Sequence, residues 1–327
     1  MCTRTMFVAD DGRVVTGRNM DWGEDMGTDL WAFGAGLERI GENGPSAFRW
    51  TSQHSSVIAA GYNCGTTDGI NDAGLVANLL YLAESDFGTP GDRPILSVGA
   101  WTQYVLDQCA TVAEAVEMMQ TAPFDMTAPA LPNNKKSGLH LSLSDASGDS
   151  AILEFIGGAL AVHHSGDHRV MTNSPVYEQQ LAINAYWKEI GGDVMLPGTS
   201  RAADRFVRAS FYLGNLPTEV DARTAAAGVF SVQRNASKPL GASSPDRPEL
   251  SKTLWTTVSD SMAGRYFFQD TLTPDVFWVD LDQLDFANSP RSRRLDLQGH
   301  PIVSGEASAR FETAEPFAFL GSPPVTG

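Results

Sequence analysis

The chain has 327 residues, of which 42% are hydrophobic, so it is long and apolar enough to bury a sizeable core. Its formal net charge of -16 leaves no large basic surface for phosphate backbones or anionic membranes, and we expect no nucleic-acid partner. No apolar run approaches the roughly 18 residues that a membrane span requires, so we expect no membrane insertion.

The cysteines and the start of the chain bear on the cellular compartment. Cys2, Cys64 and Cys109 are too few for a disulfide framework and fit no zinc-binding spacing. No charged and apolar leader precedes Met1, so the sequence as given predicts a cytoplasmic protein. If Met1 replaces a removed signal peptide, the expected compartment is the periplasm instead.

Cys2 follows the initiator methionine directly. Removal of Met1 would leave a thiol and a free α-amine on the same residue, which is a nucleophile with its own base. This pair is suited to amide cleavage through a thioester. On its own, however, a cysteine at position 2 is mostly incidental.

The first 22 residues predict a β-hairpin that brings polar groups back to Cys2. Two β-rich runs are joined by a turn at Asp10-Asp11-Gly12, so the second strand returns beside the first. Arg18 and Asp21 are therefore expected near Cys2. A guanidinium favours the thiolate, and a carboxylate can hold the α-amine by hydrogen bonds.

The rest of the chain alternates blocks of strands and blocks of helices. Strands are predicted at 57–60 and 74–80 around a turn at 66–69, and a three-stranded meander at 139–143, 150–155 and 159–163. Helices are predicted at 95–109, 113–119 after a Thr111 cap, 176–190, 201–213 and 220–231, before a closing meander at 254–258, 265–269 and 276–280. This order predicts layered antiparallel sheets with helices outside, an α+β fold.

The polar, proline-containing segment from residue 287 to 327 predicts an extended C-terminal arm. We expect it to pack through Phe311, Phe317 and Phe319, with oligomer contacts as the alternative.

Several motifs together resemble the choloylglycine hydrolase family, whose N-terminal-nucleophile amidohydrolases include bile salt hydrolases and penicillin V acylases. The resemblance covers about residues 2 to 285. Each motif is weak alone, but the set is specific in this order: Cys2, Gly17-Arg18-Asn19-Met20-Asp21, Gly69-Ile70-Asn71-Asp72-Ala73-Gly74-Leu75, Thr172-Asn173-Ser174-Pro175, Pro197-Gly198-Thr199-Ser200 and Asp204-Arg205-Phe206-Val207-Arg208.

The resemblance implies a four-layer αββα sandwich of antiparallel sheets, formed by a single amidohydrolase domain over residues 2–327. It implies a cofactor-free and metal-free enzyme that acts on a small amide substrate, and a homo-oligomer, specifically a homotetramer. The implied catalytic residues are Cys2, Arg18, Asp21, Asn173 and Arg205. Asn173 would contribute to the oxyanion hole, and Arg205 would complete the charge network.

Departures from the family pattern bear on the substrate. Where bile-salt-cleaving members often have a second asparagine, this chain has Tyr81, as in penicillin V acylases; Asn78 is the alternative for that position. Trp22 and the short span from Asn173 to Arg205 resemble the Gram-negative branch. These features favour penicillin V or an N-acyl homoserine lactone over conjugated bile salts, with Trp22 and Tyr81 as candidate substrate contacts.

Two further features have competing interpretations. His163, His164 and His168 form a cluster, but its spacing matches no helical metal motif, which favours solvated turn histidines over a metal site. A non-enzymatic module that binds amphipathic ligands is the competing function class. The joint presence of Cys2 and its partner residues argues against it, since a binding pocket needs no terminal thiol.

Overall fold

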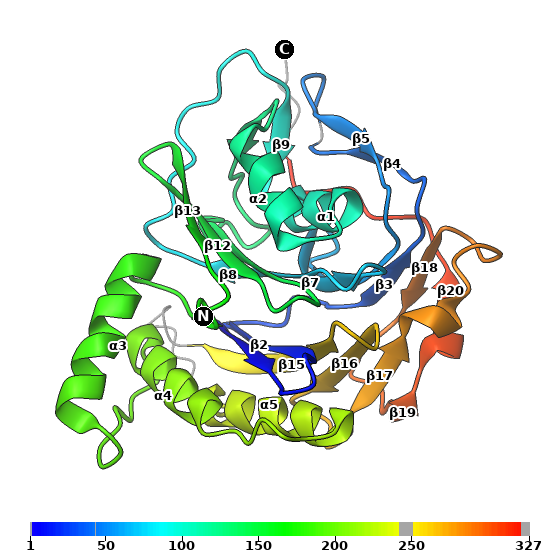
Figure 1. The fold of residues 1–327 in the computed structure, drawn as a ribbon. Helices are drawn as coiled ribbons and strands as arrows, with labels where there is room; N and C mark the ends of the chain where they lie inside the picture. The colour runs from blue at the N-terminus through cyan, green and yellow to red at the C-terminus, as the bar shows by residue number, and fades with distance from the viewer. Residues whose placement is uncertain (1, 43, 242–250, 322–327) are drawn as a thin grey trace.

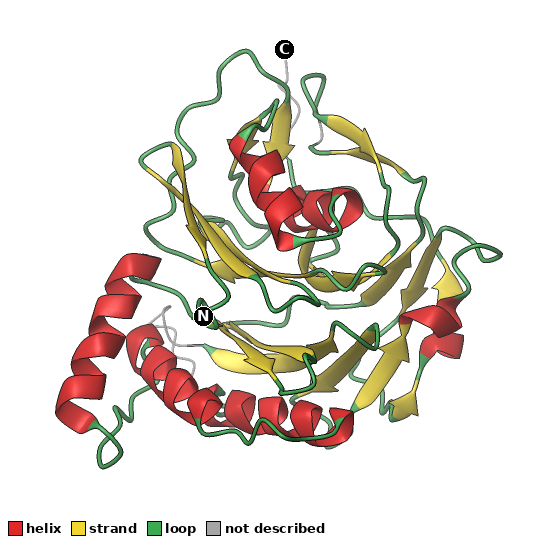
Figure 2. Cartoon of the chain, in the orientation of Figure 1, coloured by secondary structure: helices red, strands yellow, loops and turns green. Residues whose placement is uncertain are grey.

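The computed structural model describes residues 2–42, 44–241 and 251–321. Two sheets stack face to face in the middle, with helices on both outer faces (Figures 1 and 2). Helices α1 (Val98–Gln108) and α2 (Val112–Gln120) cover the larger sheet, and α4 (Ala202–Gly214) and α5 (Ala222–Ala236) pack on the smaller one. The predicted four-layer αββα arrangement is confirmed.

The smaller sheet contains the N-terminal hairpin as its second and third strands, β1 (Cys2–Val8) and β2 (Val14–Trp22). Strands β1 and β2 pair with Cys2 opposite Met20, and Gly12 has the positive φ of 84° that the predicted turn requires. The strands in spatial order are β14 (Val170–Met171), β1 (Cys2–Val8), β2 (Val14–Trp22), β15 (Lys252–Asp260), β16 (Arg265–Asp270), β17 (Phe277–Asp280) and β19 (Gly305–Glu306). All neighbours are antiparallel except β17 and β19.

The larger sheet contains the predicted meander, which is confirmed as β13–β12–β11. In spatial order its strands are β13 (Ala159–His164), β12 (Ser150–Ile156), β11 (Leu139–Ser144), β8 (Val76–Tyr81), β7 (Gly65–Asn71), β6 (Ser56–Gly61), β3 (Leu30–Phe33), β18 (Ser292–Leu295) and β20 (Glu312–Thr313). Strands β4 (Glu38–Ile40) and β5 (Arg49–Thr51) form a separate pair.

The turn predicted at 66–69 is wrong, because these residues lie within β7. The chain turns earlier, where Tyr62 and Asn63 have φ values of 54° and 47°, and again at Gly74 with φ of 85°. Asp68 explains why the sequence wrongly predicts a turn here. Aspartate is typical of turns, but in the fold this side chain is buried and contacts polar groups of the opposite sheet.

The helices follow the prediction closely, with shifted ends. Helix α1 begins three residues later than expected, because Ser97 caps it and 95–97 form a short strand. Thr111 caps α2 in a capping box with Glu114, as its sequence indicates. The elements are β9 (Ile95–Ser97), α1 (Val98–Gln108), α2 (Val112–Gln120), β10 (Asp125–Thr127), α3 (Tyr177–Gly191), α4 (Ala202–Gly214) and α5 (Ala222–Ala236). Strands β9 and β10 pair in parallel.

The segment after residue 287 contributes to both sheets, through β18 and β20 on one and β19 on the other. The 3-10 helix η1 (Leu281–Leu284) precedes this segment, and the 3-10 helix η2 (Ser308–Arg310) lies within it, between β19 and β20. Phe311 packs in the core between the sheets, whereas Phe317 and Phe319 pack with the core under α1 and α2. The described part of this segment therefore adds hydrogen-bonded strands as well as aromatic contacts.

Candidate active site

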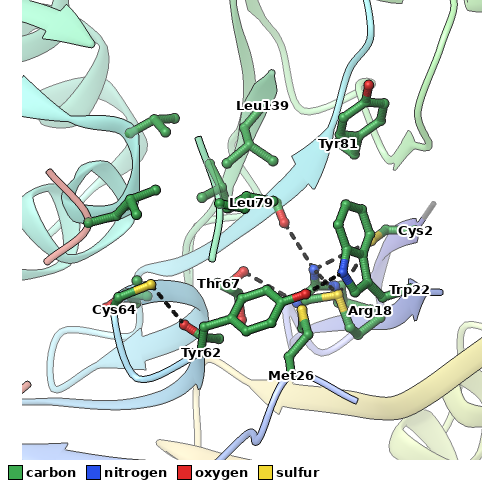
Figure 3. A pocket seen from close by; sticks show the side chains of 18 residues that line it. Cys2, Arg18, Trp22, Met26, Tyr62, Cys64, Thr67, Leu79, Tyr81 and Leu139 are labelled. Atoms are coloured by element: carbon green, nitrogen blue, oxygen red, sulfur yellow. Dashed lines mark hydrogen bonds between the residues drawn. The ribbon is translucent and has the colours of Figure 1, made fainter. Parts of the chain in front are cut away.

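Cys2 opens β1 at a pocket that residues of both sheets line (Figure 3). The residue is only 3% exposed. Its backbone N–H donates to Oδ1 of Asn173 at 2.5 Å, and its carbonyl accepts from Nη1 of Arg205 at 2.5 Å. Asn173 and Arg205 thus hold the backbone of Cys2, while its thiol faces the pocket.

Arg18 occupies the point at which β7 and β8 separate. The β7–β8 ladder ends at Asp68, and beyond it the carbonyls of Thr67 and Leu79 accept from Nη1 and Nη2 of Arg18, at 3.3 and 2.9 Å. The same Nη2 lies 3.5 Å from Sγ of Cys2. A fully buried cation at this distance favours the thiolate form of a cysteine.

Asp21 is fully buried on the same strand as Arg18 but belongs to a different set of contacts. Its Oδ1 accepts from the hydroxyl of Thr253 at 2.6 Å, and its Oδ2 lies 3.7 Å from Nη1 of Arg205. Burial lowers the pKa of Arg205, and the charge of Asp21 opposes this shift. Arg205 links Asp21 to Cys2, whose carbonyl it also binds.

Asn173 follows β14 and connects three parts of the site. Its Oδ1 accepts from the Cys2 N–H and from Nη2 of Arg205 at 2.9 Å, while its Nδ2 donates to the carbonyl of Tyr81 at 2.7 Å. Gln180 on α3 holds the Asn173 carbonyl in turn. The side chain is therefore fixed beside Cys2 with its amide directed at the end of β8.

Thr199, in the motif before α4, has a local structural role. Its hydroxyl donates to Oδ2 of Asp204 at 2.5 Å and accepts from the N–H of Arg201 at 3.2 Å. These bonds fix the turn that begins α4, the helix that carries Arg205.

Tyr81 lines the pocket, whereas Asn78 faces away from it. The Asn78 amide donates to Oδ2 of Asp68 at 2.7 Å, between the sheets. Across the β8–β11 ladder the N–H of Leu82 donates to Gly138, so the alternation of ladder bonds turns the N–H of Tyr81 away from β11. That N–H projects on the side of β8 where Arg18 and Asn173 bind.

The pocket is lined mostly by apolar side chains, and Trp22 forms one of its walls (Figure 3). The rings of Trp22 and Tyr81 have centroids 6.1 Å apart, and Nε1 of Trp22 donates to the hydroxyl of Tyr62 at 2.8 Å. In Figure 3 Cys2 and Cys64 lie at opposite ends of the labelled set. Other lining residues are Met20, Met26, Val98, Leu131, Leu139 and Leu320.

The remaining cysteines and histidines lie in other environments. Burial raises the pKa of Cys64 to about 11 and that of Cys109 to about 12, so both thiols stay protonated at neutral pH. His164 hydrogen-bonds Asp149 at 2.7 Å. Within the described ranges, no three His, Cys, Asp or Glu side chains form a group that could hold a metal ion. No helix in these ranges has both the length and the apolar character to cross a membrane.

Sequence reasoning missed Asp68, Thr253 and Tyr266, which contact the charged groups of the site from other strands. Thr253 bonds Asp21, and Tyr266 donates to Asp68 at 2.6 Å. Their only sequence signal is a polar residue within an otherwise apolar strand pattern, and that signal does not identify the partner.

Comparison with known proteins places this geometry in a family. The model of a protein family described as "Linear amide C-N hydrolases, choloylglycine hydrolase family" matches residues 2–299. A penicillin V acylase from Pectobacterium atrosepticum is 46% identical, with 98% of this chain and 92% of the relative covered.

Solved structures agree with the sequence match. The structure of penicillin V acylase from Agrobacterium tumefaciens has a TM-score of 0.91 at 49% identity, with 98% of this chain and 100% of that chain covered. A conjugated bile acid hydrolase from Clostridium perfringens has a TM-score of 0.74 at 18% identity, with both chains fully covered at 100%, and shares the fold. The chain therefore belongs to the choloylglycine hydrolase family of linear amide C–N hydrolases.

Proposed function

We propose that this enzyme cleaves the side-chain amide of penicillin V, or a closely similar acyl amide, with Cys2 as its nucleophile. The observation that carries the proposal is the position of the Cys2 thiol, 3.5 Å from a buried guanidinium and at the wall of an apolar pocket. The close similarity to two penicillin V acylases, at 46% and 49% identity, supports the substrate class.

The proposed reaction has two steps. In the first, Sγ of Cys2 bonds to the amide carbonyl carbon, the C–N bond breaks, and the α-amine of Cys2 passes the thiol proton to the leaving amine. In the second, water adds to the thioester, releases the carboxylic acid and restores the thiol. The α-amine becomes available once Met1 is removed, and the amine of Cys2 is then the general base and acid.

Each neighbouring side chain has a proposed role that follows from its contacts. Arg18 stabilises the thiolate, and Asp21 orients the α-amine as part of the network through Arg205. Asn173 uses one hydrogen of Nδ2 for the Tyr81 carbonyl, which leaves the second hydrogen for an oxyanion. The backbone N–H of Tyr81 is the proposed second oxyanion donor.

The pocket favours a flat ring or an acyl chain over a steroid. Trp22 and Tyr81 lie beside Cys2, and apolar area can be buried only where the shape of a ligand lets it reach those rings. N-acyl homoserine lactones present such a chain and are the second substrate class to be tested. Burial of one such group contributes a few kcal/mol at about 25 cal/mol per Å², enough for roughly a hundredfold preference.

A hydrolysis panel of penicillin V, a long-chain N-acyl homoserine lactone, glycocholate and taurocholate tests the proposal. We expect the highest kcat/KM for penicillin V or the lactone, a mass that lacks Met1, and loss of turnover by at least about a thousandfold in Cys2→Ser. Faster cleavage of glycocholate would refute the substrate class. Full activity in Cys2→Ala would refute the mechanism, and binding of penicillin V without cleavage of any amide would favour the binding-module alternative.

We also propose that the protein assembles as a homotetramer. Apolar side chains at the C-terminal end of α3 and just beyond it support self-association, since Tyr186, Ile190, Val194 and Met195 are 61%, 47%, 96% and 52% exposed. Light scattering coupled to gel filtration should give four times the 35.1 kDa chain mass. A 35.1 kDa particle across a range of concentrations would contradict this proposal.

A further inference from the structure

Asp68 is a buried carboxylate that connects the two sheets behind the candidate nucleophile. It lies on β7 of the larger sheet, and its side chain is 0% exposed. Its Oδ2 is 3.6 Å from Nη1 of Arg18, which extends from β2 of the smaller sheet. Its Oδ1 accepts from the hydroxyl of Tyr266 on β16 at 2.6 Å.

Asp68 faces a cation and several hydrogen-bond donors in the buried layer between the sheets. Burial raises the pKa of this carboxyl above its ordinary value, and the charge of Arg18 and hydrogen bonds from Tyr266, Asn78 and Thr257 oppose that shift in part. Tyr266 remains a donor, because burial raises the pKa of its hydroxyl well above the ordinary value. A fully buried guanidinium also requires a compensating charge.

Arg18 therefore stands between two groups. Nη1 of its guanidinium lies beside the carboxylate of Asp68, and Nη2 lies beside the thiol of Cys2. The carbonyls of Thr67 and Leu79 hold both nitrogens in the gap where β7 and β8 separate. Because Asp68 is the last β7 residue of the ladder before this gap, its position and that of Arg18 are set by the same feature of the sheet.

We propose that Asp68 is a positioning residue that anchors Arg18 in the gap between β7 and β8. The positive charge of Arg18 is then shared between the carboxylate of Asp68 and the thiol of Cys2. The inference rests on the proposed role of Cys2 as nucleophile. Tyr266 from β16 faces Asp68, whereas Arg205 from α4 binds the carbonyl of Cys2 and pairs with Asp21 from β2.

Replacement of Asp68 by Asn tests the shared charge. Thr67 and Leu79 would still hold the guanidinium, so Arg18 would stay beside Cys2 with its charge no longer balanced. Cys2 is alkylated with iodoacetamide at a series of pH values from 5 to 9, and peptide mapping measures the rate at this residue. The midpoint of the rate against pH should then lie about one pH unit lower than in the unmodified sequence. Turnover should fall several-fold with little change in KM, since a more stabilised thiolate is a weaker nucleophile.

Asp107→Asn is the matched control. Asp107 is a second buried aspartate, with Oδ2 3.3 Å from Nε of Arg39, and burial raises its pKa in the same way. It lies on α1, and it does not line the pocket. The control should lower the melting temperature and leave the alkylation midpoint of Cys2 unmoved.

An unmoved or higher midpoint in Asp68→Asn would overturn the proposal and assign Asp68 a purely structural role. If Asp68→Asn does not fold, Tyr266→Phe decides, because it removes one hydrogen bond from Asp68 and keeps the ring. We expect a smaller shift in the same direction, and no shift would overturn the proposal. Alkylation requires no turnover, so the result is independent of whether penicillin V is cleaved.

Discussion

Arg18 and Asp21 lie on opposite faces of β2. Arg18 is the diagonal cross-strand neighbour of Cys2, since Cys2 pairs with Met20 and Arg4 pairs with Arg18. It therefore meets the thiol, whereas Asp21 faces Thr253 and Arg205. The thiol and the backbone of Cys2 are thus in contact with different charged groups.

At this scale we predict that Arg18→Ala slows alkylation of Cys2 at pH 7 by at least about tenfold, because the thiolate loses its neighbouring cation. Circular dichroism should still show a cooperatively folded protein. Arg4→Ala is the control, since Arg4 is equally buried on the neighbouring strand but binds the carbonyls of His168 and Leu143. An alkylation rate equal to that of the control would remove Arg18 from its proposed role.

Among the elements, the segment at the C-terminal end of the described chain forms part of the pocket wall. The N–H of Leu320 donates to the carbonyl of Cys64 at 2.6 Å, and a Cβ at Gly99 would lie 3.0 Å from the Leu320 Cβ. Leu320 lines the pocket together with both residues. Because Cys64 lies across the pocket from Cys2 in Figure 3, Leu320 belongs to the end that an acyl group would reach last.

Leu320→Ala should therefore shift acyl preference toward longer chains. Each additional buried methylene is worth about 0.8 kcal/mol, or about fourfold in kcat/KM. The measurement is kcat/KM for a series of N-acyl homoserine lactones of increasing chain length. Leu272→Ala, at a 53% exposed leucine outside this pocket, should leave the profile unchanged. An identical chain-length profile in both variants would exclude Leu320 as the limit of the pocket.

Across the whole molecule, a buried network joins the larger sheet to the helical layer next to Asn173. Glu154 on β12 accepts from Nδ1 of His140 at 2.9 Å and from the N–H of Tyr177 at the start of α3. Nε2 of His140 lies 2.9 Å from the carbonyl of Thr172. Both ring nitrogens of His140 thus lie within hydrogen-bond distance of an oxygen, one on β12 and one next to Asn173.

This network predicts a specific loss of stability in acid. Burial alone would raise the pKa of Glu154, but hydrogen bonds from His140 and His163 outweigh it and lower the pKa to about 2. The ordinary value is about 4.3, so this contribution is present above that pH and is lost as the pH falls toward 2. Its size is on the order of 2–3 kcal/mol.

Urea denaturation of the unmodified chain and Glu154→Gln at several pH values measures this contribution. The difference in free energy of unfolding should be largest near neutral pH and should close between about pH 5 and pH 2. Asp149→Asn is the control, because Asp149 pairs with His164 in a more exposed position. A difference that is constant with pH would show that Glu154 titrates in the folded protein as it does in the unfolded chain.

The sequence by itself determined the hairpin, the meanders, the five helices and the family. These features depend on local patterns, such as the Asp10-Asp11-Gly12 turn and the Thr111 cap, and on motifs that stay contiguous in the chain. Strands of two or three residues, such as β14 and β20, were not predicted, because so short a segment has no periodicity of its own.

Only the tertiary structure decided which polar residues meet. Asp68 lies in a predicted turn of the sequence, yet it is a buried partner of Arg18 because β7 stacks against β2 and β16. The structure also distinguished Tyr81 from Asn78, whose side chain binds Asp68 and faces away from the pocket. Such contacts join residues far apart in the chain, and their energy depends on burial and distance that no local pattern contains.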